Sequence, residues 1–132
     1  MPNFRISEAA ALLGVSDDTV RRWADQGRLP VQKSAGGRLT VDGRELAAFA
    51  QSLADAPEPG HTIGASARNR LRGIVTRVTK DGLMAQVEIQ AGPFRVVSLM
   101  SREAADELAL EVGVVAVASV KSTHVVVELP EV

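Results

Sequence analysis

The sequence predicts a two-domain α+β protein, with a helical domain first and a small β-barrel domain second. Before residue 55, Ala and Leu recur at helical spacing, whereas the second half is rich in Val and Ile that alternate with polar residues. Between the halves, the segment Asp55-Ala-Pro-Glu-Pro-Gly60 cannot continue a helix or a strand ladder. We therefore expect domains at 1–55 and 62–132, joined by a linker at 56–61.

The composition limits the classes of function. Of the 132 residues, 45% are hydrophobic but only 3% are aromatic, so the core must consist of small aliphatic side chains. The net charge of -1 gives no overall attraction to nucleic acid, so a nucleic-acid site must be a local basic patch. The absence of cysteine excludes disulfides, thiolate metal sites and cysteine nucleophiles. No apolar run approaches the roughly 20 residues that span a bilayer, so we expect a cytoplasmic protein with no membrane partner.

Two short helices are predicted in the first half. Ser7 is the expected N-cap of a helix that ends at Gly14, because glycine tolerates the left-handed conformation of a helix exit. Ser16 is the expected N-cap of a second helix over 17–26. Two helices joined by a tight glycine turn are typical of a helix-turn-helix. A hairpin with a glycine tip should follow over 29–41, and then a third helix that Asp42 and Glu45 cap.

This order of elements resembles the excisionase and MerR-like winged helix-turn-helix family over about residues 4–50. The residues that carry the resemblance are Ser7-Glu-Ala-Ala, Leu13-Gly-Val-Ser16, Thr19-Val-Arg-Arg-Trp23, Gly27-Arg-Leu-Pro30 and Gly37-Arg38. The resemblance implies that the second helix enters the major groove of double-stranded DNA and that the hairpin follows the phosphates. The expected DNA-binding residues are Thr19, Arg21, Arg22, Lys33 and Arg38. Alternatively, Arg21 and Arg22 are solvated surface residues of a vestigial or protein-binding module.

The second half predicts a five-stranded OB-like β-barrel with one short helix. The expected strands are 71–78, 84–89, 94–100, 114–120 and 125–129, with the helix at 102–108. Asp81-Gly82 and Gly92-Pro93 supply the turns between the first three strands.

Two motifs of this half resemble the molybdenum-binding Mop, or molbindin, family, which is of the TOBE type. They are Ser66-Ala-Arg-Asn-Arg-Leu-Arg-Gly73 near the start and Ser119-Val-Lys-Ser-Thr-His124 after the fourth strand. The resemblance covers about residues 64–130 and implies molybdate or tungstate as the ligand. Carried over by position, the oxyanion ligands are Ser66, Arg68, Lys121 and Ser122, with Ser98 and Ser101 as further candidates. One departure is Ala109, where the family commonly has glycine.

The residue chemistry of these motifs agrees with an anion site. Molybdate is a dianion without protons to donate near neutral pH, so its site needs only donors and cations. Ser66 and Arg68 project to one side if the chain is extended, and Lys121 and Ser122 lie at a strand end. No carboxylate lies in either motif. Taken singly, these residues would be ordinary surface residues, and Arg68 could instead pair with Glu103 or Glu107.

The two motifs lie about fifty residues apart in a chain with only one Mop-type domain. In the family, single-domain members form hexamers built from dimers and bind the anion where subunits meet. We therefore expect a homo-oligomer, a dimer or a hexamer built from dimers, with anion sites at its interfaces. No nucleophile–base pair is apparent, so the sequence predicts a protein that is not an enzyme.

Three functions are compatible with these features. The first is a transcriptional regulator that responds to molybdate or tungstate. The second is an intracellular store or buffer of the oxyanion, whose helix-turn-helix does not read DNA. The third is a regulator whose barrel binds another dianion, such as sulfate.

Overall fold

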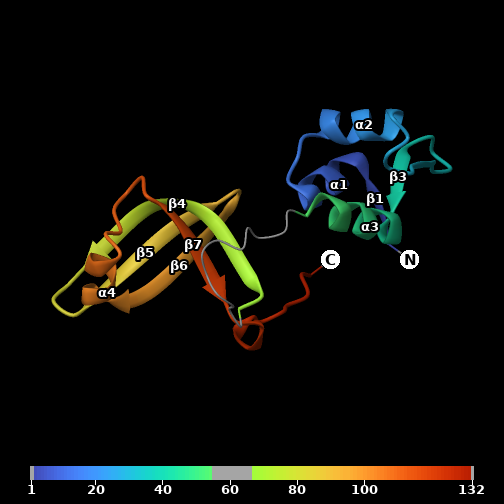
Figure 1. Cartoon of the computed structure of the whole chain (residues 1–132). Helices are drawn as coiled ribbons and strands as arrows, with labels where there is room; N and C mark the ends of the chain where they lie inside the picture. Colours follow the sequence, from blue (N-terminus) through green and yellow to red (C-terminus); the bar gives the residue numbers. More distant parts are fainter. Residues whose placement is uncertain (1, 55–66, 132) are drawn as a thin grey trace. The chain divides into compact units, whose positions relative to one another are not determined.

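The computed structural model describes residues 2–54 and 67–131 and divides the chain into two units, Met1–Ala56 and Pro57–Val132 (Figure 1). The predicted linker at 56–61 lies outside the described residues. In the part that the structure describes, no helix is long and apolar enough to cross a membrane.

Three helices form most of the N-terminal unit. They are α1 (Ile6–Leu13), α2 (Asp17–Asp25) and α3 (Gly43–Leu53). Gly14 ends α1 with a left-handed φ of 71°, and the Ser16 hydroxyl accepts a hydrogen bond from the Thr19 amide at 3.2 Å. These two predicted helix ends are confirmed, and they fix the tight turn between α1 and α2.

The predicted N-cap of α1 was wrong by two residues. The helix begins at Ile6, and Arg5 occupies the cap position. The Glu8 carboxylate accepts hydrogen bonds from the backbone amide of Arg5 at 3.0 Å and from its Nε at 3.1 Å. The carboxylate thus satisfies a free amide at the helix start, and the Ser7 hydroxyl is not needed as a cap.

A small antiparallel sheet completes the N-terminal unit. Its strands are β1 (Asn3–Arg5), β2 (Gln32–Lys33) and β3 (Leu39–Asp42), in the order β1-β3-β2. The β2–β3 hairpin is confirmed, whereas β1 was not predicted because three residues are too few to show an alternating pattern. The core of this unit is formed by Ile6, Ala9, Ala10, Val20, Leu29, Val41, Leu46 and Phe49.

The C-terminal unit is a curled four-stranded antiparallel sheet in the order β6-β5-β4-β7. Its elements are β4 (Asn69–Lys80), β5 (Met84–Ala91), β6 (Phe94–Ser101), α4 (Arg102–Glu107) and β7 (Val115–Val120). β4 pairs with β7 through its first half and with β5 through its second half, so it bends between the two partners (Figure 1). The predicted α+β architecture with an OB-like second half is therefore confirmed.

The prediction of a fifth strand at 125–129 was wrong, because this segment does not form a strand. After β7 the chain forms a 3-10 turn, η1 (Ser122–His124), and 125–131 has no regular structure. The side chains of Val126, Val127 and Leu129 are 82%, 85% and 92% exposed. A strand requires a neighbouring ladder for its amides and a face on which to bury its apolar side chains, and among the described residues the tail has neither.

One face of the sheet carries the core of the C-terminal unit. This core comprises Val75, Ala85, Val87, Ile89, Ala105 and Leu110. The opposite face of β5 carries Glu88, which is nevertheless only 7% exposed. The guanidinium groups of Arg95 and Arg77 pair with its carboxylate and cover it, so this buried charge is compensated.

Candidate oxyanion site and nucleic-acid interface

Pairing of β4 with β7 brings the two predicted oxyanion motifs to the same end of the sheet. Asn69, at the start of β4, lies opposite Val120, at the end of β7. The Asn69 side-chain amide donates a hydrogen bond to the Val120 carbonyl at 3.1 Å. Arg68 immediately precedes this pair, and Lys121 follows it. The separation of the motifs in sequence therefore does not by itself require two subunits, contrary to the argument made from the sequence.

The predicted oxyanion ligands that the structure describes are open to solvent. Arg68, Lys121 and Ser122 are all exposed, and Ser122 begins the turn η1. Ser66, the fourth predicted ligand, lies outside the described residues. No salt bridge joins Arg68 to Glu103 or Glu107, although the structure describes all three side chains. The arrangement offers two cations and a hydroxyl without a competing acid, but one chain does not enclose them.

Two further arginines, which the sequence analysis did not single out, extend this positive region. Arg70 lies opposite Ser119, and Arg72 lies opposite Val117. The spacing of 68, 70 and 72 along an extended chain, which places alternate residues on one face, could have identified them. No Asp or Glu occurs in 67–80 or 112–127, the two segments that form this part of the sheet. The local potential therefore favours an anion.

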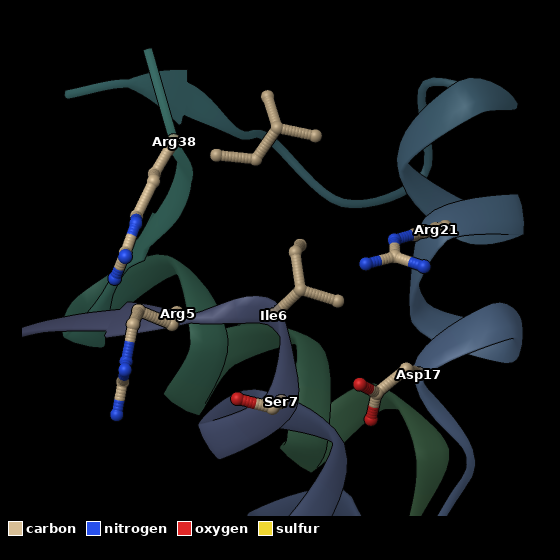
Figure 2. Close-up of a pocket in the computed structure, with 7 residues that line it drawn as sticks. Arg5, Ile6, Ser7, Asp17, Arg21 and Arg38 are labelled. Atoms are coloured by element: carbon tan, nitrogen blue, oxygen red, sulfur yellow. The ribbon is translucent and has the colours of Figure 1, made fainter. Parts of the chain in front are cut away.

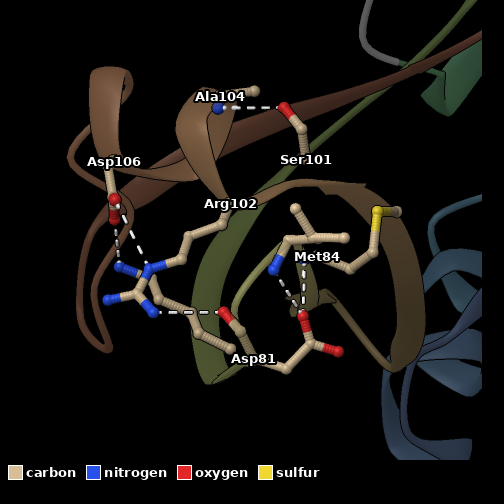
Figure 3. A network of polar contacts seen from close by, with 8 residues as sticks. Asp81, Met84, Ser101, Arg102, Ala104 and Asp106 are labelled. Atoms are coloured by element: carbon tan, nitrogen blue, oxygen red, sulfur yellow. Dashed lines mark hydrogen bonds and ion pairs between the residues drawn. The ribbon is translucent and has the colours of Figure 1, made fainter.

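The structure does not bring Ser98 and Ser101 to this end of the sheet. Both lie in β6, which forms the edge opposite β7. Ser98 pairs with Val87, and the Ser101 hydroxyl caps α4 by accepting a hydrogen bond from the Ala104 amide at 3.1 Å (Figure 3). Within one chain, neither serine can share an anion with Arg68 and Lys121.

The far end of the sheet carries a group of acids from the β4–β5 turn and α4, among them Asp81 and Asp106. Arg102 lies between the Asp106 carboxylate and the Asp81 carbonyl (Figure 3), at 3.7 and 3.1 Å. A hydrogen bond from Lys80 is the main reason that the pKa of Asp106 lies below its usual value. Asp106 therefore stays ionised near neutral pH, and with Glu103 and Glu107 it disfavours a dianion at this end.

The predicted DNA-binding residues lie on two elements of the N-terminal unit, α2 and the β2–β3 hairpin. Arg21 and Arg22 are exposed on α2, and Lys33 and Arg38 are exposed on the hairpin. The Thr19 hydroxyl is 2.9 Å from the Ser16 hydroxyl, so it already takes part in the cap of α2. Thr19 therefore contributes to the N-terminal cap of α2, and its hydroxyl is not free of other contacts.

A hollow of about 400 Å³ lies between the start of α1, the first part of α2 and the hairpin. It brings together Arg21 and Arg38 from the predicted set and adds Arg5, Ser7 and Asp17 (Figure 2). Arg22 and Lys33 do not line it. Arg5 was not predicted as a site residue, although its spacing of three from Glu8 indicates an ordered side chain at a helix start.

Acidic side chains partly neutralise this basic surface. Glu8 pairs with Arg5, and hydrogen bonds from the Arg5 amide and side chain hold the pKa of Glu8 below its usual value. Asp18 lies 3.9 Å from the Arg21 guanidinium, and both side chains are largely exposed. Such exposed pairs are weak, so a phosphate group can displace them.

Comparison with known families assigns both halves of the chain. The family model described as TOBE domain matches residues 65–127, and the one described as Helix-turn-helix domain matches residues 4–54. Both matches agree with the resemblances seen in the sequence. No curated protein is significantly similar to the chain.

Solved structures similar to the chain cover about half of it. A molybdate-binding protein from Sporomusa ovata is 25% identical, with a TM-score of 0.49, over 51% of this chain and 100% of its own. MopII from Clostridium pasteurianum is 34% identical, with a TM-score of 0.47, over 50% of this chain and 100% of its own. The cytoplasmic molybdate-binding protein ModG, solved with molybdate bound, is 30% identical, with a TM-score of 0.44, over 52% of this chain and 46% of its own.

Proposed function

This chain joins a helix-turn-helix domain to a TOBE domain, and we propose that it is a DNA-binding regulator that responds to molybdate or tungstate. The observation that carries the proposal is the Asn69–Val120 pairing. Arg68 directly precedes this pair, Lys121 and Ser122 directly follow it, and the two chain segments concerned, 67–80 and 112–127, contain no acidic residue. The ligand named for the similar solved structures, molybdate, is a dianion that suits such a donor set.

The chemistry of the site supports a tetrahedral oxyanion over other small ligands. The Arg68 guanidinium and the Lys121 ammonium can only donate hydrogen bonds, and the Ser122 hydroxyl is able to donate. An oxyanion without protons is satisfied by donors alone, whereas a ligand with donors of its own would leave them unpaired. In the described residues, no group of three or more His, Asp or Glu side chains could hold a metal ion.

We propose that a second copy of the chain completes the site. Arg68, Lys121 and Ser122 are exposed, and a charged hydrogen bond is strong only where water is excluded. The outer face of the β4–β7 pair leads directly to them. It carries Ile74, Val115 and Val117, which are 46%, 57% and 46% exposed and are followed by Arg70 and Arg72. A copy packed on the apolar part would therefore also cover the anion.

Calorimetric titration with molybdate, tungstate and sulfate tests the oxyanion site. We expect molybdate and tungstate to bind well and sulfate to bind about a hundredfold more weakly. The shorter bonds of sulfate leave donors unmet, and each lost hydrogen bond to a charged group costs about 1.5–3 kcal/mol. Arg68→Ala and Lys121→Ala should abolish binding. Arg102→Gln, which removes an exposed cation from the far end of the sheet, should leave binding unchanged.

Equal binding of sulfate would contradict a molybdate-selective site and favour a regulator of another dianion. Unchanged binding by the Arg68→Ala and Lys121→Ala variants would contradict the site itself.

The second candidate function is an oxyanion store or buffer that does not read DNA. The pairing of Arg5 with Glu8 and of Arg21 with Asp18 favours it, because these acids weaken attraction to phosphates. A screen of duplex fragments from the source genome, with and without molybdate, separates the two functions. The fluorescence of Trp23 can report binding, because this residue lies in α2 and contacts Phe49 with a ring-centre distance of 5.1 Å.

A further inference from the structure

We infer that the hollow between α1, α2 and the hairpin is a pocket for one backbone phosphate of duplex DNA, with Arg5 as a phosphate ligand. This inference rests on the proposed DNA-binding function and assigns a defined contact within it. Three arginines from separate elements line the hollow. Arg5 ends β1, Arg21 lies in α2, and Arg38 immediately precedes β3.

The arginines face the hollow from both sides. In Figure 2, Arg5 and Arg38 extend along one wall, while Arg21 lies on the opposite wall and the Ser7 hydroxyl lies near the floor. A guanidinium presents five N–H donors in a planar fork that matches the oxygens of a phosphate. Donors that converge from opposite walls can bind both free oxygens of one phosphodiester.

The protein orders the Arg5 side chain and the backbone that carries Arg38 before DNA arrives. The Glu8 carboxylate accepts from Nε of Arg5, which leaves the terminal nitrogens of Arg5 available as donors. The hairpin that carries Arg38 is closed by a hydrogen bond from the Ser34 amide to the Arg38 carbonyl at 2.7 Å. Ordering these groups in advance reduces the entropy lost on binding.

The negative charge of Asp17 makes the pocket selective for a phosphodiester over free phosphate. Its carboxylate lies below Arg21 on the α2 side (Figure 2), where it repels a free multivalent anion. A phosphodiester carries a single negative charge, and contacts elsewhere on the duplex bring it to the pocket. We therefore expect the hollow to bind a DNA phosphate but not inorganic phosphate.

Salt-dependent binding of the full chain to an arbitrary 20-base-pair duplex tests the inference. Each neutralised phosphate contributes about 0.9 to the slope of log K against log salt concentration. Arg5→Gln should weaken binding about tenfold and lower the slope by about one. Arg5→Lys restores the charge and should recover the slope. The matched control is Arg44→Gln, which removes an exposed cation from α3, outside the hollow, and should change neither quantity.

Circular dichroism of Arg5→Gln separates loss of the phosphate contact from loss of α1, and Glu8→Gln gives a second control. Glu8→Gln removes the partner of Arg5 but keeps the cation, so its salt slope should match that of the wild type. If the wild type binds DNA and Arg5→Gln behaves like Arg44→Gln, the pocket inference is overturned while the proposed function stands. If the wild type binds no duplex at low salt, both are overturned.

Discussion

Ala109 is held in a backbone conformation that alanine rarely adopts. Its φ is 52°, and it is the only residue other than glycine with a positive φ in the described part of the chain. The Leu110 amide donates to the Ala105 carbonyl at 3.1 Å, and the Ala109 amide donates to the Asp106 carbonyl at 3.0 Å. These two bonds form a Schellman ending to α4, in which the left-handed position usually belongs to glycine.

Replacing Ala109 with glycine should stabilise the C-terminal unit. The left-handed conformation costs an alanine about 1–2 kcal/mol, and the greater freedom of glycine in the unfolded chain offsets part of that gain. We expect the free energy of unfolding to rise by about 0.5–1 kcal/mol in urea titrations. Gly113→Ala is the matched control, because Gly113 has a φ of 97° and the change should destabilise the unit. A destabilised Ala109→Gly variant would contradict this account.

At the scale of single residues, the sequence predicted caps better than charged contacts. Ser16 and Gly14 act locally, so their roles follow from their neighbours in the chain. Arg5 enters the hollow with Arg21 and Arg38 through pairing of β1 with β3, which no local pattern reveals. The position of Ser98 and Ser101 on the edge opposite β7 was not foreseen for the same reason, since strand order decides which edge they occupy.

At the scale of the elements, β4 is notable because its two halves pair with different strands. Residues 69–74 pair with β7, residues 74–80 pair with β5, and the β4–β5 register shifts between Val75 and Arg77. At the crossing, the backbone of Gly73 lies very close to Gln90 of β5. A Cβ on Gly73 would lie 2.4 Å from the Gln90 carbonyl oxygen. Glycine is therefore required here for close approach of two backbones.

Gly73→Ala should destabilise the C-terminal unit by about 1–3 kcal/mol, because the two backbones must separate to admit the methyl group. Gly82→Ala is the matched control in the β4–β5 turn. A Cβ there meets no atom within 4 Å, and the φ of Gly82 lies outside the left-handed region. That change should be neutral or slightly stabilising. Thermal unfolding followed by circular dichroism measures both, and equal melting temperatures for the two variants would contradict the close-approach account.

The strands that the sequence predicted correctly have both an alternating hydrophobic pattern and a neighbouring strand with which to pair. Strands β4 to β7 show alternation, and each has a neighbour in the sheet. The tail at 125–129 is as rich in valine as β7, yet it forms no strand because no segment that the structure describes pairs with it. Hydrophobic pattern predicts strand propensity, but the ladder depends on a partner that the pattern does not specify.

At the scale of the whole molecule, the exposed hydrogen-bond donors of Arg68, Lys121 and Ser122 can bind an anion strongly only where water is excluded from them. The outer face of the β4–β7 pair places Ile74 beside Val115, Arg72 beside Val117 and Arg70 beside Ser119. Continuing by two residues along each strand, this register leads to Arg68 and Lys121. Apolar and basic residues therefore form one continuous surface. If a second copy covers the apolar part, anion binding and self-association must be linked, because each favours the same closed state.

Val115→Gln tests this linkage without adding a charge near the arginines. Loss of a buried valine costs roughly 1.5 kcal/mol or more, so we expect the dissociation constant of the oligomer to rise about tenfold or more. Molybdate affinity should fall with it, and at high protein concentration it should recover. Leu83→Gln is the matched control, since Leu83 is 80% exposed in the turn between β4 and β5, away from the β4–β7 face. Sedimentation across a dilution series, with and without molybdate, measures the association. If Val115→Gln is a monomer that still binds molybdate with wild-type affinity, one chain excludes enough water by itself, and no second copy is needed to hold the anion.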